Sequence, residues 1–184
     1  MLRKIYYWLS PDLRRKARRL VYLPVDVLAG VAGRRQKLVP PTGMIFTGRG
    51  DFVRTGDEFL NRFIESAGLQ PHHQVLDIGC GIGRMARPLA GFLNEKGAYE
   101  GFDIVEEGVR WCSQKYHDFP NFRFRHLPLR NDLYNLSVSE QASRFTFPYE
   151  DNSFNLAISI SVFTHMQKSE VNQYLQETAR VLKP

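Results

Sequence analysis

Three glycines at alternate positions near the middle of the chain are the residues best suited to hold a ligand. The stretch Gln74 to Arg84 reads QVLDIGCGIGR, in which a short apolar run leads into Gly79, Gly81 and Gly83. Glycines adopt backbone angles that other residues avoid, and they let a ligand approach the main chain. The helical pattern that begins near Arg84 points its first N–H groups at the same place. We therefore predict a strand, a Gly-rich turn and a helix start that together bind a flat polar group.

Two carboxylates accompany the glycines. Asp77 stands just before the turn, and Asp103 ends a predicted strand twenty residues after Gly83. In an open α/β sheet an acid at that strand end accepts hydrogen bonds from the two hydroxyls of a ribose. The alternative is that Asp103 caps the following helix. The pattern D-x-G-x-G-x-G differs from the dinucleotide fingerprint G-x-G-x-x-G, because the sixth position from Gly79 is Arg84. A nucleoside ligand is favoured over a dinucleotide.

The remaining patterns supply the elements that would position these residues. Strands alternate with amphipathic helices from about residue 56 to the end, which predicts right-handed crossovers and a mainly parallel sheet. The fold class is therefore α/β, Rossmann-like and doubly wound, with helices on both faces. The run NLAISISVF from Asn155 is too continuously apolar for an edge strand. The expected strands are 75–78, 98–103, 121–127 and one from 155, and the expected helices are 56–67, 84–93, 105–117 and 168–182.

The N-terminal segment differs in charge from the rest of the chain. Residues 1–40 contain ten Lys/Arg and two Asp, a net charge of +8, whereas residues 41–184 carry −2. Ser10 caps a predicted helix that ends near Leu23, because Pro24 stops it, and a second short helix follows. We divide the chain into a basic helical arm (1–40), a linker (41–55) and a domain (56–184). Contact with an anionic membrane, a solvated basic face and contact with nucleic acid remain open for the arm, the last being the least favoured.

Other sequence features bear on location and metals. Cys80 and Cys112 lack metal-ligand spacing, and the chain start has no secretory signal pattern. The longest apolar stretch, residues 20–33, is interrupted by Pro24 and Asp26 and is too short to span a bilayer. We expect a cytoplasmic protein without a metal site. If the arm binds lipid, the protein would be peripheral to the inner face of the membrane.

Four segments resemble motifs of the class I S-adenosylmethionine-dependent methyltransferases: VLDIGCGIGR, FDIVEEGV, FPYEDNSFNLAISISVFTHM and ARVLKP. The resemblance covers about residues 56–184 and implies S-adenosyl-L-methionine as cofactor. It places the turn under the methionine part of the cofactor, Asp77 in ordering that turn, Asp103 at the ribose and Ile104 beside the adenine. It also places Ser159 and Ser161 along the methionine side. The implied cofactor-binding set is Asp77, Gly79, Cys80, Gly81, Gly83, Arg84, Asp103, Ile104, Ser159 and Ser161.

The sequence departs from the family pattern at two places. Pro128 stands where many relatives have an acid near the adenine, which leaves Leu127, Leu129 and Asn131 as candidates. The chain also ends at Pro184, before the last strands of the family sheet, so we expect a domain truncated at its C-terminus.

The expected function is methyl transfer to a small-molecule, lipid or glycan acceptor. His165 is the candidate general base for a hydroxyl acceptor. Arg84 and Tyr149 are candidates for contacts at the pocket mouth. The alternatives are a cofactor-binding or docking protein without turnover and, less favoured, an NAD-dependent oxidoreductase.

Overall fold

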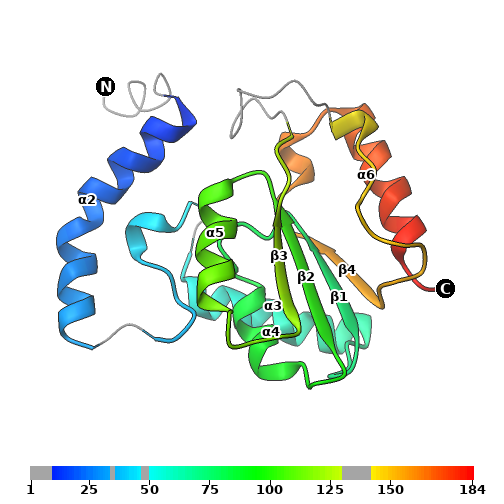
Figure 1. The fold of residues 1–184 in the computed structure, drawn as a ribbon, viewed down its shortest axis with the longest axis horizontal. Helices are drawn as coiled ribbons and strands as arrows, with labels where there is room; N and C mark the ends of the chain where they lie inside the picture. The colour runs from blue at the N-terminus through cyan, green and yellow to red at the C-terminus, as the bar shows by residue number, and fades with distance from the viewer. Residues whose placement is uncertain (1–9, 34–35, 47–49, 130–141) are drawn as a thin grey trace.

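The centre of the molecule is a parallel four-stranded sheet. The computed structural model describes residues 10–33, 36–46, 50–129 and 142–184 (Figure 1). The strand order is β3-β2-β1-β4, and each neighbouring pair is parallel. This arrangement confirms the predicted Rossmann-like α/β fold. The strands are β1 (Gln74–Ile78), β2 (Ala98–Asp103), β3 (Phe122–His126) and β4 (Leu156–Ser159).

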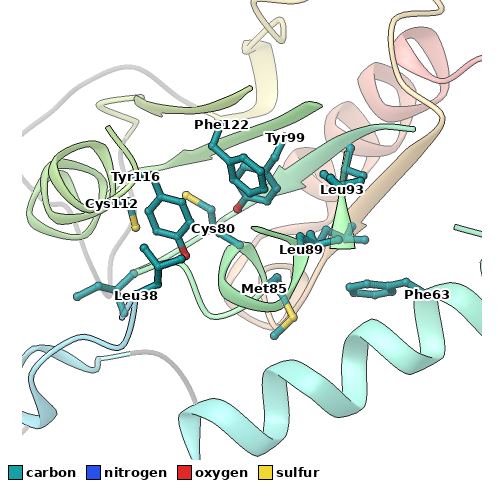
Figure 2. Close-up of a cluster of buried hydrophobic side chains, with 14 of the residues drawn as sticks. Leu38, Phe63, Cys80, Met85, Leu89, Leu93, Tyr99, Cys112, Tyr116 and Phe122 are labelled. Atoms are coloured by element: carbon teal, nitrogen blue, oxygen red, sulfur yellow. The ribbon is translucent and has the colours of Figure 1, made fainter. Parts of the chain in front are cut away.

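Two apolar cores lie on the two faces of this sheet, because successive side chains of a strand point to opposite faces. Val75 packs in one core with residues of three helices, and Leu76 packs in the other with residues of the closing helix. Figure 2 shows part of the first core, including the nearly parallel rings of Tyr99 and Phe122. The helices on the first face are α3 (Phe52–Ala67), α4 (Ala86–Phe92) and α5 (Glu106–Lys115), and α6 (Lys168–Val181) covers the second.

The helix before the sheet begins earlier than predicted. α3 starts at Phe52, inside the segment that we assigned to a linker, and Asp51 caps it by accepting the N–H of Arg54 at 2.7 Å. Its end agrees with the sequence, because Gly68 follows it with a left-handed φ of 62°. Leu38, farther upstream, is buried in the first core. Leu38 of the arm and Phe52 of the linker are therefore both packed in the first core of the domain.

The prediction that Pro24 ends the first helix is wrong. α2 runs without interruption through Pro24, from Pro11 to Val31. Proline cannot donate a hydrogen bond to the carbonyl four residues earlier. That carbonyl belongs to Leu20, a residue that is 71% exposed. Water can therefore donate the hydrogen bond that Pro24 cannot. The short 3-10 helix η1 (Thr42–Met44) packs on α2.

The last described strand lies at the edge of the sheet among the described residues, which differs from our expectation. Its apolar side chains pack into the layers above and below the sheet. Beyond its outer side, Phe154 and Leu182 form an isolated parallel bridge. Two 3-10 turns, η2 (Ala142–Arg144) and η3 (Phe163–His165), stand before and after β4. No helix in the described ranges has the length and apolar character needed to cross a bilayer.

Candidate cofactor site

The Gly-rich turn is fixed to the neighbouring strand by its own backbone. The φ angles of Gly79, Gly81 and Gly83 are 75°, 58° and 79°, all in the region that favours glycine. The N–H groups of Gly79 and Cys80 both donate to the carbonyl of Phe102, at 2.9 and 3.0 Å. The turn therefore sits at the carboxyl end of β1, held by the end of β2.

The space beside two of these glycines belongs to the protein itself. A Cβ on Gly79 would lie 2.4 Å from Cγ2 of Val162, and one on Gly83 would lie 2.9 Å from Sγ of Cys112. We interpreted the missing Cβ atoms as room for a ligand. At these two positions they instead let the segment after β4 and helix α5 close around the turn.

Asp103 holds the middle of the turn. Its Oδ2 accepts the N–H of Gly81 at 2.7 Å, and its Oδ1 accepts the N–H of Val105 at 2.8 Å. The second bond precedes α5, whose N-cap residue is Val105 and which has no side-chain cap, so the alternative that Asp103 caps this helix is not observed. Each carboxylate oxygen has a second lone pair, so these bonds leave capacity for a hydroxyl donor. Burial raises the pKa of Asp103, and its backbone hydrogen bonds act against that rise.

Asp77 lies deeper, beneath the turn, and is almost completely buried. The hydroxyl of Tyr99 donates to its Oδ2 at 2.6 Å. The pKa of Asp77 is raised to about 7 as the net result of three causes: burial raises it most, the Tyr99 hydrogen bond lowers it, and the nearby charge of Asp103 raises it. A Cβ on Gly101, which pairs with Asp77 across the strands, would meet the Tyr99 ring at 2.9 Å. The position of the Tyr99 ring therefore requires a glycine at 101, and its hydroxyl is hydrogen-bonded to the Asp77 carboxyl group.

Sequence reasoning missed the role of Gly108 in α5. A Cβ at Gly108 would lie 2.4 Å from the carbonyl oxygen of Gly81 and 3.0 Å from Cζ of Phe46. The helix therefore touches the turn backbone to backbone. A signal was present, since a glycine inside a helix costs about 1 kcal/mol relative to alanine and usually has a packing reason.

The end of β4 brings two predicted serines beside the turn. Ser159 pairs with Ile78, the residue before Gly79, and its Oγ is buried without a hydrogen-bond partner among the described residues. Ser161 has a φ of 62°, which is uncommon for a residue other than glycine. Its carbonyl accepts the hydroxyl of Thr164 at 3.0 Å. His165 ends η3, and its side chain lies outside the described part of the structure.

The other predicted residues occupy different surroundings. Arg84 is buried, with its guanidinium 5.5 Å from the ring centre of Phe52, and burial lowers its pKa. It therefore contacts the start of α3. Ile104 packs at the border of the second core, and its carbonyl lies 3.3 Å from Nε2 of His126. Tyr149 packs in that core, and its hydroxyl is buried without a partner in the described ranges.

The candidates for the adenine contact follow β3 in the sequence. Leu127 and Leu129 are both buried in the second core. Asn131 lies outside the described residues, so its assignment remains a prediction.

An ion-pair network that the sequence did not predict holds the segment before β4. Arg180 donates to Glu177 and Asp151 and to the carbonyls of Phe147 and Tyr149. Glu177 is buried and also accepts the N–H of Phe147 at 2.7 Å. These bonds fix the segment that contains Tyr149 to α6. The i, i+3 spacing of an acid and an arginine was the only sequence signal, and it normally indicates a surface pair.

The residues present fit a nucleoside carrying an amino-acid tail. Asp103 offers an acceptor at the carboxyl edge of the sheet, and the buried Ser159 Oγ offers a polar atom that needs a partner. Asp103 is hydrogen-bonded to Gly81 of the turn, and Ser159 pairs with Ile78, the residue just before the turn. Within the described residues, no cluster of three or more His, Cys, Asp or Glu side chains is arranged to hold a metal.

Comparison with known proteins agrees with this geometry. Residues 75–184 match the methyltransferase domain family. The chain is 26% identical over 117 residues to sterol 24-C-methyltransferase of Schizosaccharomyces pombe, covering 64% of this chain and 27% of that protein. It is 25% identical over 142 residues to glycine/sarcosine/dimethylglycine N-methyltransferase of Actinopolyspora halophila, covering 77% and 22%.

A solved structure shows the same relationship in three dimensions. The YcgJ protein of Bacillus subtilis superposes with a TM-score of 0.52 and 26% identity, covering 69% of this chain and 47% of that one. The chain spans about a quarter of the length of the two curated relatives. The family match nevertheless extends over more than half of the chain. The chain therefore belongs to the methyltransferase domain family, which confirms the predicted family, its Rossmann-like fold and S-adenosyl-L-methionine as cofactor.

Proposed function

We propose that the protein catalyses methyl transfer from S-adenosyl-L-methionine to a small-molecule acceptor. The observation that carries the proposal is the buried Asp103 carboxylate bonded to the N–H of Gly81. This bond places a carboxylate that can accept hydrogen bonds from ribose hydroxyls beside the Gly-rich turn. Both lie at the carboxyl edge of a parallel sheet, where α/β folds bind nucleosides.

The chain's own residues have a limited part in such a reaction. The bound cofactor supplies a methyl group that its sulfonium already activates. Asp103 would orient the ribose, and the turn at 79–83, with Ser159 and Ser161, would hold the methionine end. Positioning then provides most of the rate increase. For a hydroxyl acceptor, His165 would take the proton, and Arg84 and Tyr149 remain candidates for acceptor contacts.

The acceptor class rests on the relatives. Two of them are named for methylating a sterol and glycine derivatives, both small molecules. A lipid or a glycan acceptor belongs to the same proposal. Contact of residues 1–40 with an anionic membrane and a cytoplasmic, peripheral location would suit a lipid-linked acceptor.

Calorimetry of the full chain with S-adenosylmethionine and S-adenosylhomocysteine tests the proposal. We expect binding by the natural sequence and a loss of at least tenfold in Asp103→Ala, because a charged hydrogen bond contributes about 1.5–3 kcal/mol. Asp118→Ala is the matched control, because Asp118 is exposed and follows the C-terminal end of α5. Equal affinities in all three proteins would disprove the site.

Two further measurements separate the alternatives. Tighter binding of NAD than of S-adenosylhomocysteine would favour an oxidoreductase. Binding of the cofactor without methyl transfer from labelled S-adenosylmethionine to any sterol, amine or lipid acceptor would favour a protein without turnover.

A further inference from the structure

Helix α2 carries an apolar face that nothing else in the described chain covers. Ten large apolar side chains are strongly exposed among the described residues, and eight of them belong to α2. Leu20, Val21 and Leu28 are 70–72% exposed, and Val31 is 86% exposed. Soluble proteins rarely expose a contiguous apolar patch of this kind unless it binds something.

The exposed residues share one side of the helix. Six of the eight are separated from one another mostly by three, four, seven or eight residues. In an α-helix these separations place side chains on one face. We call this set the apolar stripe: Leu13, Leu20, Val21, Val27, Leu28 and Val31. Ala17 and Pro24 fall on the same face at the same spacing.

The opposite side of α2 is bound to the domain. Asp26 accepts the N–H groups of Thr42 and Gly43 at 2.6 and 2.9 Å. Arg19 forms an ion pair with Glu107 in the first turn of α5, and Arg15 lies 3.9 Å from the same carboxylate. These contacts orient the helix, so the apolar stripe points away from the domain. Figure 1 shows α2 at the periphery of the molecule, beyond the segment that contains η1.

Charge decides between the possible occupants of the apolar stripe. Arg14 and Lys16 flank the stripe, and residues 11–31 as a whole contain five Lys/Arg and two Asp. The other three arginines of α2 face the domain, where Arg15 and Arg19 pair with Glu107. Two copies of this helix packed through the stripe would bring like charges together. An anionic lipid surface instead matches both the apolar face and the basic flanks, the combination found in helices that lie in the membrane interface. The sequence before α2 adds Arg3, Lys4 and Trp8, which favour the same surface.

We propose that the apolar stripe of α2 docks on an anionic membrane surface and holds the domain there. The helix lies in the interface and does not cross it, because its other side is bonded to the domain. This inference deepens the proposed function by naming the surface through which residues 1–40 contact a membrane, and it does not depend on methyl transfer. Binding to vesicles and binding of S-adenosylmethionine are separate measurements, so failure of one is distinguishable from failure of the other.

Co-sedimentation of the full chain with vesicles tests the proposal. We expect binding to phosphatidylcholine vesicles that contain phosphatidylserine, weaker binding to pure phosphatidylcholine, and weakening by salt. Leu20→Gln with Leu28→Gln removes apolar area without changing charge and should reduce binding at least about tenfold. The matched control is Ile64→Gln with Leu175→Gln, which alters exposed apolar residues on α3 and α6.

The outcomes are decisive in both directions. A loss confined to the α2 variant, with an unchanged circular dichroism spectrum, supports the proposal. No binding by the natural sequence, or equal binding by both double variants, overturns it. A concentration-dependent dimer in sedimentation velocity that the α2 variant abolishes would assign the stripe to a second copy and would also overturn it.

Discussion

Oδ2 of Asp103 lies 2.7 Å from the backbone nitrogen of Gly81, so one buried carboxylate joins the end of β2 to the middle of the Gly-rich turn. The other oxygen of the same carboxylate bonds the N–H of Val105, just before α5. The shape of the turn therefore depends on the side chain to which the proposed function also assigns ribose binding. A substitution at Asp103 should affect both.

Asp103→Asn should lower affinity for S-adenosylhomocysteine by about 10- to 100-fold, since a charge-assisted hydrogen bond is lost. The amide keeps one acceptor oxygen but presents an NH₂ group to one of the two backbone N–H donors. Calorimetry gives the affinity, and thermal unfolding gives the accompanying loss of stability. An Asn variant with unchanged affinity would show that Asp103 holds the turn in place but does not bind the cofactor.

Gly108→Ala should destabilise the protein by about 1–3 kcal/mol and weaken cofactor binding, although alanine is the better helix former. The reason is the 2.4 Å approach of the new Cβ to the carbonyl oxygen of Gly81. Gly91→Ala in α4 is the matched control, because nothing lies within 4 Å of that Cβ. Urea unfolding of both variants measures the difference. Equal effects would mean that α5 can move away from the turn at little cost.

The pH dependence of stability should report the protonation of Asp77. Its pKa rises from 3.8 to about 7 on folding, so the folded protein holds a proton there that the unfolded chain has lost. This contribution is complete below about pH 4 and disappears as the pH rises through 7. Its upper limit is about 4 kcal/mol.

Asp77→Asn imitates the protonated acid and removes this dependence. Urea unfolding between pH 4.5 and 8 (about half-unit steps) should show the natural protein losing stability relative to the variant as the pH rises. Tyr99→Phe should move the midpoint upward, because the Tyr99 hydrogen bond lowers the pKa of Asp77. A free-energy difference that is constant with pH would contradict the protonation.

Arg180→Met should destabilise the protein by about 2 kcal/mol or more, because Glu177 would remain buried without its cation. Hydrogen exchange should increase at the amides of Phe147 and Tyr149, whose carbonyls Arg180 binds. Arg123→Met is the control, since Arg123 pairs with Glu100 but is largely exposed. Equal losses in the two variants would show that the buried network adds nothing beyond a surface pair.

The sequence predicted the sheet and the turn because their signals are local. The strand at Ala98–Asp103 has the predicted bounds, and the glycines adopt the left-handed angles expected of a tight turn. Family motifs then identified the fold. The contacts that complete the site are between residues distant in sequence: Val162 over Gly79, Gly108 against Gly81 and Tyr99 under the turn. Periodicity says which face a residue occupies, but it does not say which residue of another element meets it.

The N-terminal segment shows the limit of single-residue rules. Proline usually ends a helix, yet α2 continues through Pro24, and the carbonyl that loses its donor belongs to Leu20, an exposed residue. The bonds of Asp26 to Thr42 and Gly43 explain how that helix is held, and no local pattern predicts them. The role of His165 as general base and the roles of Ser161 and the other cofactor-binding residues remain predictions.

The first turn of α5 is held by contacts on two sides. Gly108 touches the carbonyl of Gly81 on one side, and Glu107 is paired with Arg19 of α2 on the other. If a ligand displaces the turn on entry, these contacts offer a direct route to α5 and from there to α2. Cofactor binding and lipid binding would then be thermodynamically linked, and each would change the affinity for the other by the same factor.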